Sequence, residues 1–548
     1  MRVLTFATAL LLSTAPISVA QTADPARSVI TPAAMEAHVT FLSDDLLEGR
    51  DTGTPGYDIA ARYVATQYRA LGLEPAVDGG WYQQVPFSQT VASTDNPPRI
   101  TLPGGAALGD NAVLRMPATA KPVQTDAVFV GHGVVDPASK RDDYAGLDVR
   151  GKTVVMFYGL PDGIAEERAQ ELMTGKSEVA IDRGAVAVIN LFDSEQTKQI
   201  PFAAVRHQLS GGQIALGGKK EPTAGETTPF GILNHEGAAA LFAGSSRDFK
   251  GVLADVDANR AVKPFALKQR IAFDGAVQAR NFTSPNVIGM IPVSNPALKG
   301  EAVLLMAHLD HVGVDEGAEG EDKIHNGAMD NASGIASMLE VARSFQQSGK
   351  PPRRTILIAA VTGEEHGLLG SEWLAKNPVV AGQKIVSVVN LDMPVLLYDF
   401  TDVVAFGAEH STMGPIVASA AATEGVTLSP DPMPEENLFM RSDHYSFVQA
   451  GVPSVFLMTG FANGGEAKFR DFLKTHYHQP SDQVDLPFDW NAAAKFARVN
   501  YAIAREMADV DQAPRWYADS PFAKTAPDMP TATRPKASPV RGGGSAKR

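Results

Sequence analysis

Three apolar runs in the second half of the chain share one pattern. They span residues 302–307, 355–361 and 385–391, are rich in Val, Ile, Leu and Ala, and are each followed by polar residues. Short, nearly continuous apolar runs predict strands that are buried on both faces of a sheet. In open α/β sheets, sites form beyond the carboxyl ends of such strands. We therefore expect the polar residues after the three runs to meet at one edge of a sheet.

The residues after these runs are of the kinds that bind divalent metal ions. His308 and Asp310 follow the first run, Glu364 and Glu365 the second, and Asp392 the third; Asp330 lies in a turn rich in Gly and Asn, and His478 follows a charged loop. The chain has no cysteine, which excludes disulfides and thiolate ligands. Any metal must therefore be held by His, Asp and Glu, the ligand types of hydrolytic zinc and manganese sites.

This set of residues can supply each part of a two-metal hydrolase. Such a site needs a carboxylate that bridges two ions about 3.5–4 Å apart, further ligands for each ion, and a free carboxylate as general base. The expected ligands are His308 and Asp392 for one ion, Glu365 and His478 for the other, and Asp330 for both.

Two acidic residues are left for other roles. Glu364 is the expected general base, because adjacent side chains diverge and Glu365 can bind metal while Glu364 faces the water. Asp310, two residues beyond His308, is expected to accept the second N–H of that imidazole and so to assist catalysis from behind the ligand.

The rest of the chain predicts two folded parts. Amphipathic patterns predict helices over residues 31–47 and over a second segment that stops at Gly72. Short strands between Asp- and Gly-rich turns predict a small β-rich domain inserted into the larger one. The expected boundaries are 31–118 and 275–510 for the catalytic domain, 119–274 for the insertion and 524–548 for a disordered tail rich in Pro, Ala, Thr and Gly.

The net charge and the N-terminal sequence indicate which partners and which cellular location to expect. The net charge of −14 argues against nucleic acid as a partner, since phosphate binding needs clustered Lys and Arg. Arg2, an apolar stretch and small residues up to Ala20 predict a secretory signal peptide of residues 1–20. The apolar stretch is shorter than the roughly 20 residues of a spanning helix, which disfavours a membrane anchor. We expect a periplasmic or secreted bacterial protein with no stable membrane span after cleavage near Ala20.

Five motifs, in this order, resemble those of the M28 family of zinc peptidases. They are His308-Leu-Asp310, Gly327-Ala-Met-Asp330-Asn331-Ala-Ser-Gly334, Glu364-Glu365, Asn390-Leu-Asp392 and Tyr477-His478-Gln-Pro-Ser-Asp482. Residues 46–56 and 441–453 also resemble the family, and the middle block around residues 131–155 is similar to the protease-associated (PA) domain often inserted in it.

The resemblance implies a fold and an activity. The implied fold is α/β, with a mixed, mostly parallel, doubly wound sheet flanked by helices and a small β-rich PA domain inserted. The implied activity is that of an aminopeptidase that holds two Zn²⁺ ions per chain and acts on peptides with a free N-terminus. By motif match the ligands are the five residues assigned above, with Glu364 as general acid/base, and no ligand position departs from the family pattern.

The sequence also gives expected positions for the other histidines and one tyrosine that could lie near the site. We expect pocket-rim or surface positions for His311, His325, His366 and His476, surface or packing positions for His132 and His207, and packing rather than substrate contact for His444 and Tyr445.

Three alternative functions stay open. Relatives of the implied fold act as carboxypeptidases or as one-zinc glutaminyl cyclases, and a non-catalytic, receptor-like protein could keep the fold without the reaction. The full ligand set weighs against the cyclase and the receptor. Zinc is the expected metal, and manganese and cobalt are alternatives.

Overall fold

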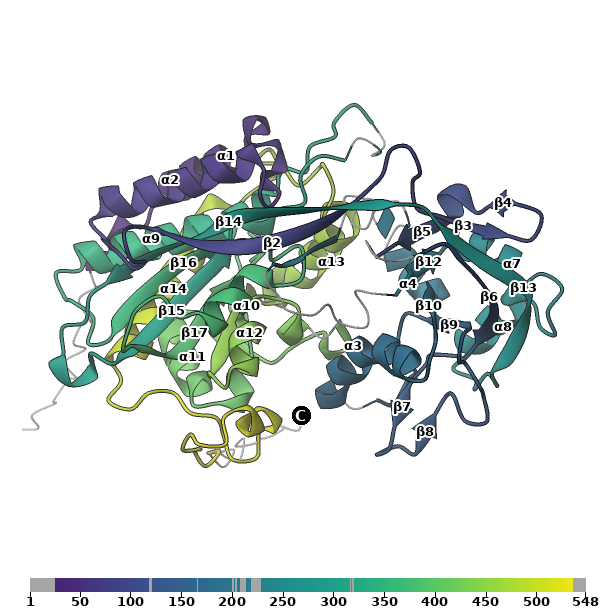
Figure 1. The fold of residues 1–548 in the computed structure, drawn as a ribbon. Coiled ribbons are helices and arrows are strands. Elements are labelled where there is room, and N and C mark those ends of the chain that lie inside the picture. The colour runs from purple at the N-terminus through teal and green to yellow at the C-terminus, as the bar shows by residue number, and fades with distance from the viewer. Residues whose placement is uncertain are drawn as a thin grey trace, which may run out of the picture.

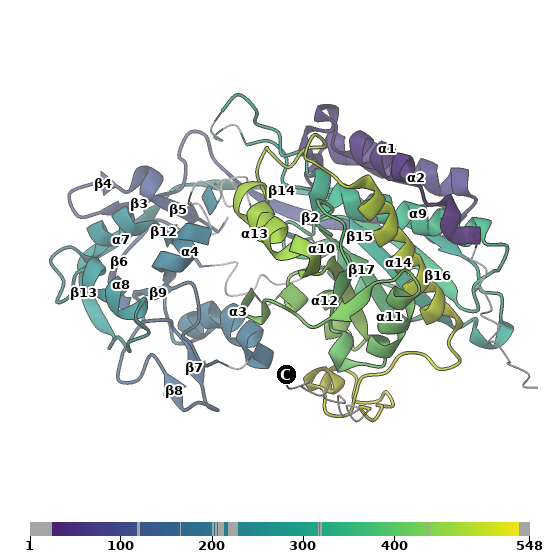
Figure 2. The same cartoon turned by 180° about the vertical axis from the view of Figure 1, so that it is seen from behind.

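The chain forms two α/β units, each built around its own sheet, which lie side by side (Figures 1 and 2). The computed structural model describes residues 25–535 except 118–120, 165, 200, 201, 203, 204, 207–212, 218–227, 316, 318, 319 and 437. The expected signal peptide and His207 lie outside the described residues.

The larger unit contains a ten-stranded mixed sheet. Its strands follow the order β11-β2-β14-β16-β15-β17-β20-β18-β19, with β1 paired to β14. Their bounds are β1 Glu74–Pro75, β2 Tyr82–Ala92, β11 Gln213–Leu216, β14 Val277–Ile291, β15 Glu301–His308, β16 Thr355–Val361, β17 Lys384–Leu391, β18 Asp402–Phe406, β19 Thr427–Ser429 and β20 Ser454–Thr459. The four central strands, β16, β15, β17 and β20, pair in parallel, and antiparallel neighbours extend the sheet on both sides.

Helices cover both faces of this sheet, as the apolar runs predict. Odd-numbered residues of β15 pack in a core with α1 (Pro32–Leu42), α2 (Pro55–Leu71), α9 (Ser333–Gln347) and α14 (Trp490–Asp509). Even-numbered residues of β15 pack in a second core with α10 (Leu369–Lys376) and α12 (His444–Gln449). Every residue of β16 is buried. The α/β fold with a doubly covered mixed sheet is therefore confirmed.

The first predicted helix is shorter than expected. It ends at Leu42, and residues Asp45–Arg50 form a separate 3₁₀ turn capped by Asp44, whose carboxylate accepts the N–H of Leu46. Leu46 therefore leaves the buried face of the helix and is 82% exposed. The second helix ends as predicted, with Gly72 in the left-handed conformation that glycine favours.

The smaller unit has an eight-stranded sheet in the order β4-β3-β13-β6-β9-β10-β12-β5. Its strands are β3 Arg99–Leu102, β4 Ala106–Ala107, β5 Ala112–Arg115, β6 Val123–Phe129, β9 Thr153–Phe157, β10 Ala187–Leu191, β12 Phe230–Leu233 and β13 Phe265–Asp274, and its helices include α3 Glu166–Asp182, α4 Ser194–Gln199, α7 His235–Phe242 and α8 Phe249–Val256. Its resemblance to a PA domain stays a prediction.

The border between the two units differs from the expected one. Strands β3, β4 and β5 precede residue 119 but pair within the smaller sheet. Strand β11, from inside the expected insertion, pairs with β2 at the edge of the larger sheet. The long strands β2 and β14 connect the units (Figure 1). Local patterns cannot reveal such exchanges, because a strand has the same alternation whichever sheet it joins.

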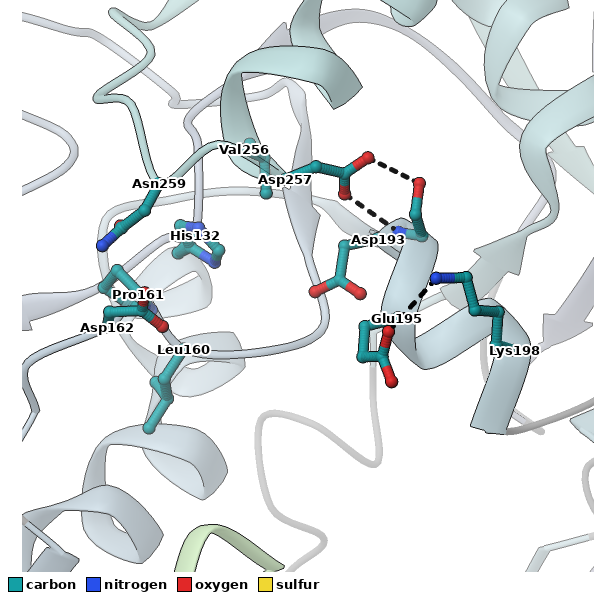
Figure 3. A pocket seen from close by; sticks show the side chains of 11 residues that line it. His132, Leu160, Pro161, Asp162, Asp193, Glu195, Lys198, Val256, Asp257 and Asn259 are labelled. Carbon is teal, nitrogen blue, oxygen red and sulfur yellow. Dashed lines mark hydrogen bonds and ion pairs between the residues drawn. The ribbon is translucent and has the colours of Figure 1, made fainter. Parts of the chain in front are cut away.

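A polar cavity of about 370 Å³ lies at the carboxyl ends of β6, β9 and β10 in the smaller unit (Figure 3). His132 lines it, with one ring nitrogen 3.1 Å from the carbonyl oxygen of Gly159. Asp257 accepts two hydrogen bonds from Ser194. In the described part of the chain, the side-chain groups able to hold a metal ion all lie in the larger unit instead.

The C-terminal segment is ordered further than expected. Residues Ala532 and Tyr517 form a β-bridge, and the guanidinium of Arg534 lies 2.9 Å from the carboxylate of Asp519. The expectation of disorder from Lys524 therefore does not hold for residues 524–535; composition misses these long-range contacts. Residues 536–548 lie outside the described range. No helix among the described residues is long and apolar enough to cross a membrane.

Candidate active site

The three predicted strand ends meet at one edge of the larger sheet. His308 is the last residue of β15, Glu364 and Glu365 follow β16, and Asp392 follows β17. Strand β15 lies between the other two and is parallel to both, with His308 opposite Val361. The chain passes from β15 to β16 on one side and then to β17 on the other, which is the strand reversal where α/β sheets form their sites.

The first group of side chains contains His308, Asp330 and Asp392. The Nε2 atom of His308 lies 3.0 Å from Oδ1 of Asp392 and 3.2 Å from Oδ1 of Asp330. All three residues are buried. Nitrogen and oxygen donors at these separations suit a divalent ion such as zinc, which takes imidazole and carboxylate ligands at about 2.0–2.2 Å.

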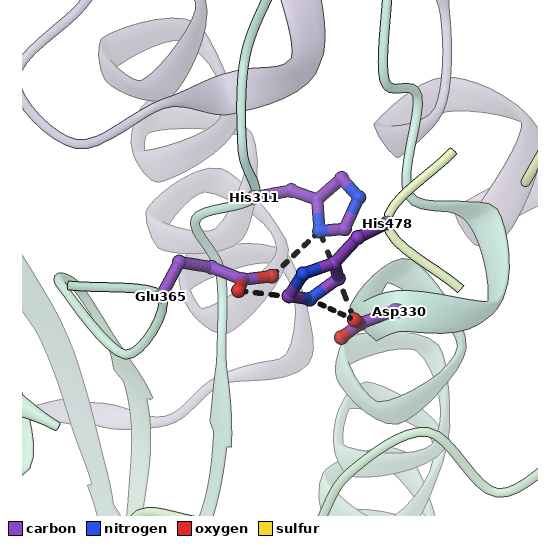
Figure 4. A group of neighbouring side chains, drawn as sticks. All are labelled: His311, Asp330, Glu365 and His478. Carbon is purple, nitrogen blue, oxygen red and sulfur yellow. Dashed lines mark hydrogen bonds and ion pairs between the residues drawn. The ribbon is translucent and has the colours of Figure 1, made fainter. Parts of the chain in front are cut away.

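The second group contains His311, Asp330, Glu365 and His478 (Figure 4). The Nε2 atom of His478 lies 3.0 Å from Oε2 of Glu365 and 3.2 Å from Oδ2 of Asp330. The Nδ1 atom of His311 lies 2.7 Å from Oε1 of Glu365. The donor atoms of this group all lie within 4.8 Å of one another.

Asp330 belongs to both groups. Its Oδ1 faces His308 and its Oδ2 faces His478, so one carboxylate spans the two sets of donors. A two-metal site requires this arrangement, in which a bridging carboxylate holds the ions as a pair. The five residues proposed as ligands from the sequence are thus brought together, and their donor atoms fit two ions that share Asp330.

The turn that carries Asp330 is held by a residue to which the sequence assigned no role. The carboxylate of Asp482 accepts the backbone N–H groups of Met329 and Asp330 at 2.9 and 3.0 Å. Asp482 is buried and lies four residues after His478. It therefore ties the loop of one expected ligand to the turn of the bridging residue. The sequence signal that could have identified Asp482 was its place in the last of the five motifs.

The carboxylate of Asp310 does not contact His308 as expected. The Nδ1–H of His308 can donate to the backbone carbonyl of Asp310, 3.1 Å away, and not to its carboxylate. The carboxylate instead accepts the N–H groups of Glu364 and Glu365, at 3.3 Å each, and the hydroxyl of Thr52. It thus positions the Glu364–Glu365 turn.

Ser442 positions Asp392 and was missed as well. Its hydroxyl donates to Oδ2 of Asp392 at 2.5 Å and accepts from the side-chain amide of Asn390 at 2.6 Å. This leaves Oδ1 of Asp392 for the His308 group. Ser442 lies two residues before α12, and only the packing of this helix against the sheet brings the hydroxyl to β17.

Arg50 links the loops that carry His308 and Asp330. Its guanidinium is 1% exposed and donates to the backbone carbonyls of Leu42, Leu309, Asn326 and Gly327. Burial lowers the pKa of Arg50 to about 10, so the group stays charged near neutral pH. The resemblance at residues 46–56 marked this stretch without indicating this role.

Two of the histidines expected at the rim or surface are buried. His311 is fully buried inside the second group, and His325 is 4% exposed. The expectation was wrong because the loop after β15 folds inward against Gly49. His366 is partly exposed and its Nε2 lies 2.8 Å from Asp51, whereas His476 contacts Ser481.

His444 packs in an aromatic core, as expected. It is fully buried, and its ring centroid lies 5.1 Å from that of Phe439 and 5.4 Å from that of Phe456. Burial lowers the pKa of His444 to about 3, so it is neutral. Tyr445 is half-buried and lies edge-on to Phe439.

The pKa values of the two adjacent glutamates are shifted in opposite directions. Burial raises the pKa of Glu364 well above its usual value, although His308 opposes this shift. Burial also acts to raise the pKa of Glu365, but His478 and His311 together outweigh it and hold this pKa far below its usual range. A carboxylate that stays ionised suits a metal ligand, and one that readily holds a proton suits a general acid/base.

Comparisons with curated proteins find local likenesses. A probable zinc metalloprotease of Pyrenophora tritici-repentis is 45% identical over 67 residues, which cover 12% of this chain and 15% of that protein. The probable glutamate carboxypeptidase AMP1 of Arabidopsis thaliana is 31% identical over 149 residues, or 24% of this chain and 21% of that protein. The chain therefore spans a small part of the length of these relatives.

Comparisons with solved structures show a shared fold over most of the chain. An aminopeptidase from Aneurinibacillus sp. strain AM-1 superposes with a TM-score of 0.56 at 20% identity, covering 89% of this chain and 96% of that one. BSAP, a zinc aminopeptidase from Bacillus subtilis, superposes with a TM-score of 0.51 at 18% identity, covering 88% and 97%.

The family model named Peptidase family M28 matches residues 286–504. This segment contains the central parallel strands and every side chain of the two groups described above. The match and the geometry concern the same edge of the same sheet, and on these grounds residues 286–504 of this chain belong to peptidase family M28.

Proposed function

We propose that the chain is a metallo-aminopeptidase that removes N-terminal residues from peptides with the help of two divalent ions, zinc in the first instance. The observation that carries the proposal is the position of Asp330, which presents one carboxylate oxygen to each of two donor groups. His308 and Asp392 would complete one ion site, and Glu365 and His478 the other.

The chemistry divides between the ions and Glu364. When bound, two divalent ions acidify a water molecule and polarise the carbonyl of the scissile bond. Glu364 follows β16 beside the cluster, where one of its oxygens lies within 4.8 Å of donor atoms of His308 and Glu365. In the proposed reaction Glu364 takes a proton from the attacking water and delivers it to the leaving amine.

The carboxyl groups around the cluster support recognition of an amine. Beside the ligand carboxylates, the buried carboxyl groups of Asp310 and Asp443 lie near, and burial raises the pKa of Asp443 to about 7. The buried guanidinium of Arg50 donates to backbone carbonyls and is not offered to a substrate. A carboxyl group at the site can accept hydrogen bonds from the amine of a peptide's N-terminus, whereas a C-terminal carboxylate has no N–H to donate.

A carboxypeptidase is the second candidate. It is favoured by the names of curated relatives such as AMP1, a probable glutamate carboxypeptidase. Recognition of a C-terminal carboxylate needs a cation. Arg441 precedes Ser442, is 51% exposed and contacts Glu436 at 3.7 Å, so its guanidinium is available to such a substrate.

Substrates blocked at one end separate the two candidates. We expect release of the chromophore from amino-acyl p-nitroanilides with a free amine, and no hydrolysis of N-acetylated peptides that keep a free C-terminus. A chelator should lower the rate by more than about 100-fold, because the ions supply several kcal/mol of transition-state stabilisation, and added Zn²⁺ should restore it. Hydrolysis of the blocked peptides, from the C-terminus, would instead identify a carboxypeptidase.

We also propose that the protein is exported after cleavage near Ala20, on the basis of the N-terminal sequence. When the full-length chain is expressed in a bacterial host with a secretion pathway, the protein recovered from the periplasm or medium should begin close to Gln21. Intact-mass measurement and N-terminal sequencing check this expectation. Recovery of the chain in the cytoplasm or the membrane with residues 1–20 still attached would contradict it.

A further inference from the structure

His311 occupies a position that is shaped for its ring. It lies three residues after His308 in the loop that follows β15, and it is fully buried. The ring packs on Gly327, where an added Cβ would lie 2.6 Å from ring atoms of His311 and 2.3 Å from the carbonyl oxygen of Asp330. A glycine at this point therefore leaves room for the imidazole beside the bridging turn.

His311 and His478 each contact a different oxygen of the Glu365 carboxylate. The Nδ1 atom of His311 lies 2.7 Å from Oε1, and the Nε2 atom of His478 lies 3.0 Å from Oε2 (Figure 4). The two rings meet at an interplanar angle of 76°. Both oxygens of Glu365 thus have a fixed direction, one toward each imidazole.

The contact between His311 and Glu365 is shorter than the contacts between the proposed ligands. Two donors that bind one tetrahedral zinc ion at 2.0–2.1 Å lie about 3.3 Å apart. The four contacts between proposed ligands, at 3.0–3.2 Å, are close to this separation. The 2.7 Å contact between His311 and Glu365 is instead the length of a charge-assisted N–H···O bond, and His311 lies 3.9 Å from Asp330.

We propose that His311 is a positioning residue for the second ion site and not one of its ligands. Its Nδ1–H donates to Oε1 of Glu365, which directs Oε2 toward the ion that His478 and Asp330 would share. A glutamate side chain has several rotatable bonds, so a hydrogen bond that fixes one oxygen removes wrong orientations before the metal binds. The inference rests on the proposed two-ion function and adds a residue to it.

Matched variants at position 311 test this role. Asparagine places an amide N–H near the position of Nδ1, so His311→Asn should keep the bond to Glu365, whereas His311→Ala removes it. His476→Ala is the control, because it removes a histidine from the loop of His478 that faces Ser481. Zinc affinity is measured by competition with a chromophoric chelator, and thermal unfolding of the metal-free proteins checks that each variant folds.

The expected result is a graded loss of affinity at one ion. His311→Ala should weaken one of the two zinc-binding steps by about 10–100-fold, the usual effect of removing a partner that orients a ligand. His311→Asn should recover most of that loss, and His476→Ala should stay within about twofold of the unaltered protein. X-ray absorption of the zinc-loaded protein should find about one imidazole per zinc, from His308 and His478.

Other outcomes separate this inference from the function on which it rests. If the unaltered protein binds two zinc ions but shows about 1.5 imidazoles per zinc, or if His311→Asn is as weak as His311→Ala, then His311 is a ligand. If His311→Ala binds zinc as tightly as the unaltered protein, then His311 has no role. In each case only the inference fails. If the unaltered protein binds well under one zinc ion per chain, the proposed function itself fails. The absorption measurement needs no variant, so it decides even if His311→Ala does not fold.

Discussion

The Glu364→Gln variant should lose about 10²–10⁴-fold in kcat and still bind both ions. This range is the usual contribution of a positioned general acid/base, and glutamine keeps the size of glutamate but cannot accept the proton. Glu364 lies beside the cluster, but Asp330, Glu365 and Asp392 are the proposed bridging and terminal carboxylate ligands. Metal content and the rate with an amino-acyl p-nitroanilide are the two measurements.

The pKa of Glu364 explains why this carboxyl suits the role. Burial raises its pKa well above the usual value, so the group holds a proton more readily than Glu365 beside it. Divalent cations nearby act in the opposite direction, because a positive charge favours the carboxylate. The two effects together favour a group that can both take and return a proton near neutral pH.

Glu365→Gln is the matched control for this prediction. It makes the same chemical change one residue later, but at a proposed ligand, so it should lower zinc content as well as rate. A Glu364→Gln protein with a near-normal rate would show that another residue is the base. Loss of zinc from this variant would show instead that Glu364 binds metal.

The Asp330→Ala variant should weaken the binding of both ions together. Apparent zinc-binding free energies of four-ligand protein sites are about 10–16 kcal/mol, so one ligand accounts for about 3 kcal/mol, or roughly 100-fold in affinity. Asp330 faces both donor groups, and its removal therefore costs each ion a ligand. Activity should fall below detection at zinc concentrations that saturate the unaltered protein.

Asp392→Ala provides the comparison, because Asp392 belongs to the His308 group and not to the group of Glu365 and His478. This variant should weaken one binding step and leave the other near its original affinity. Metal titration followed by calorimetry resolves the steps. Equal loss of a single step in both variants would mean that Asp330 serves one ion only, and the two-ion arrangement would then have to be abandoned.

The strand-end residues could be predicted because the relevant signals are local. An apolar run reports that a strand is buried, and the residues that follow it lie at the end of that strand. His308, Glu365 and Asp392 were identified in this way, and the structure brings them together at one edge of the sheet. Asp330 and His478 lie in loops, and they were identified as ligands from the motifs around them and not from the hydrophobic pattern.

The residues that hold the ligands could not be predicted in the same way. Asp310 supports the Glu364 turn and not His308, while Ser442 and Asp482 reach their partners from other elements of the fold. His311 was expected at the rim and is buried against Gly327. Each of these roles depends on which element packs beside which, and a single sequence does not contain that information in its local pattern.

The sequence by itself determined the α/β class, the buried strands and the types of side chain that meet at their ends. It could do so because side-chain alternation and apolar run length are properties of one segment and its solvent exposure. Only the tertiary structure decided which oxygen of Asp330 or Glu365 faces which imidazole and which sheet receives strands β3, β5 and β11. These features arise from contacts between segments far apart in the chain, where the direction of a side chain depends on packing from several elements at once.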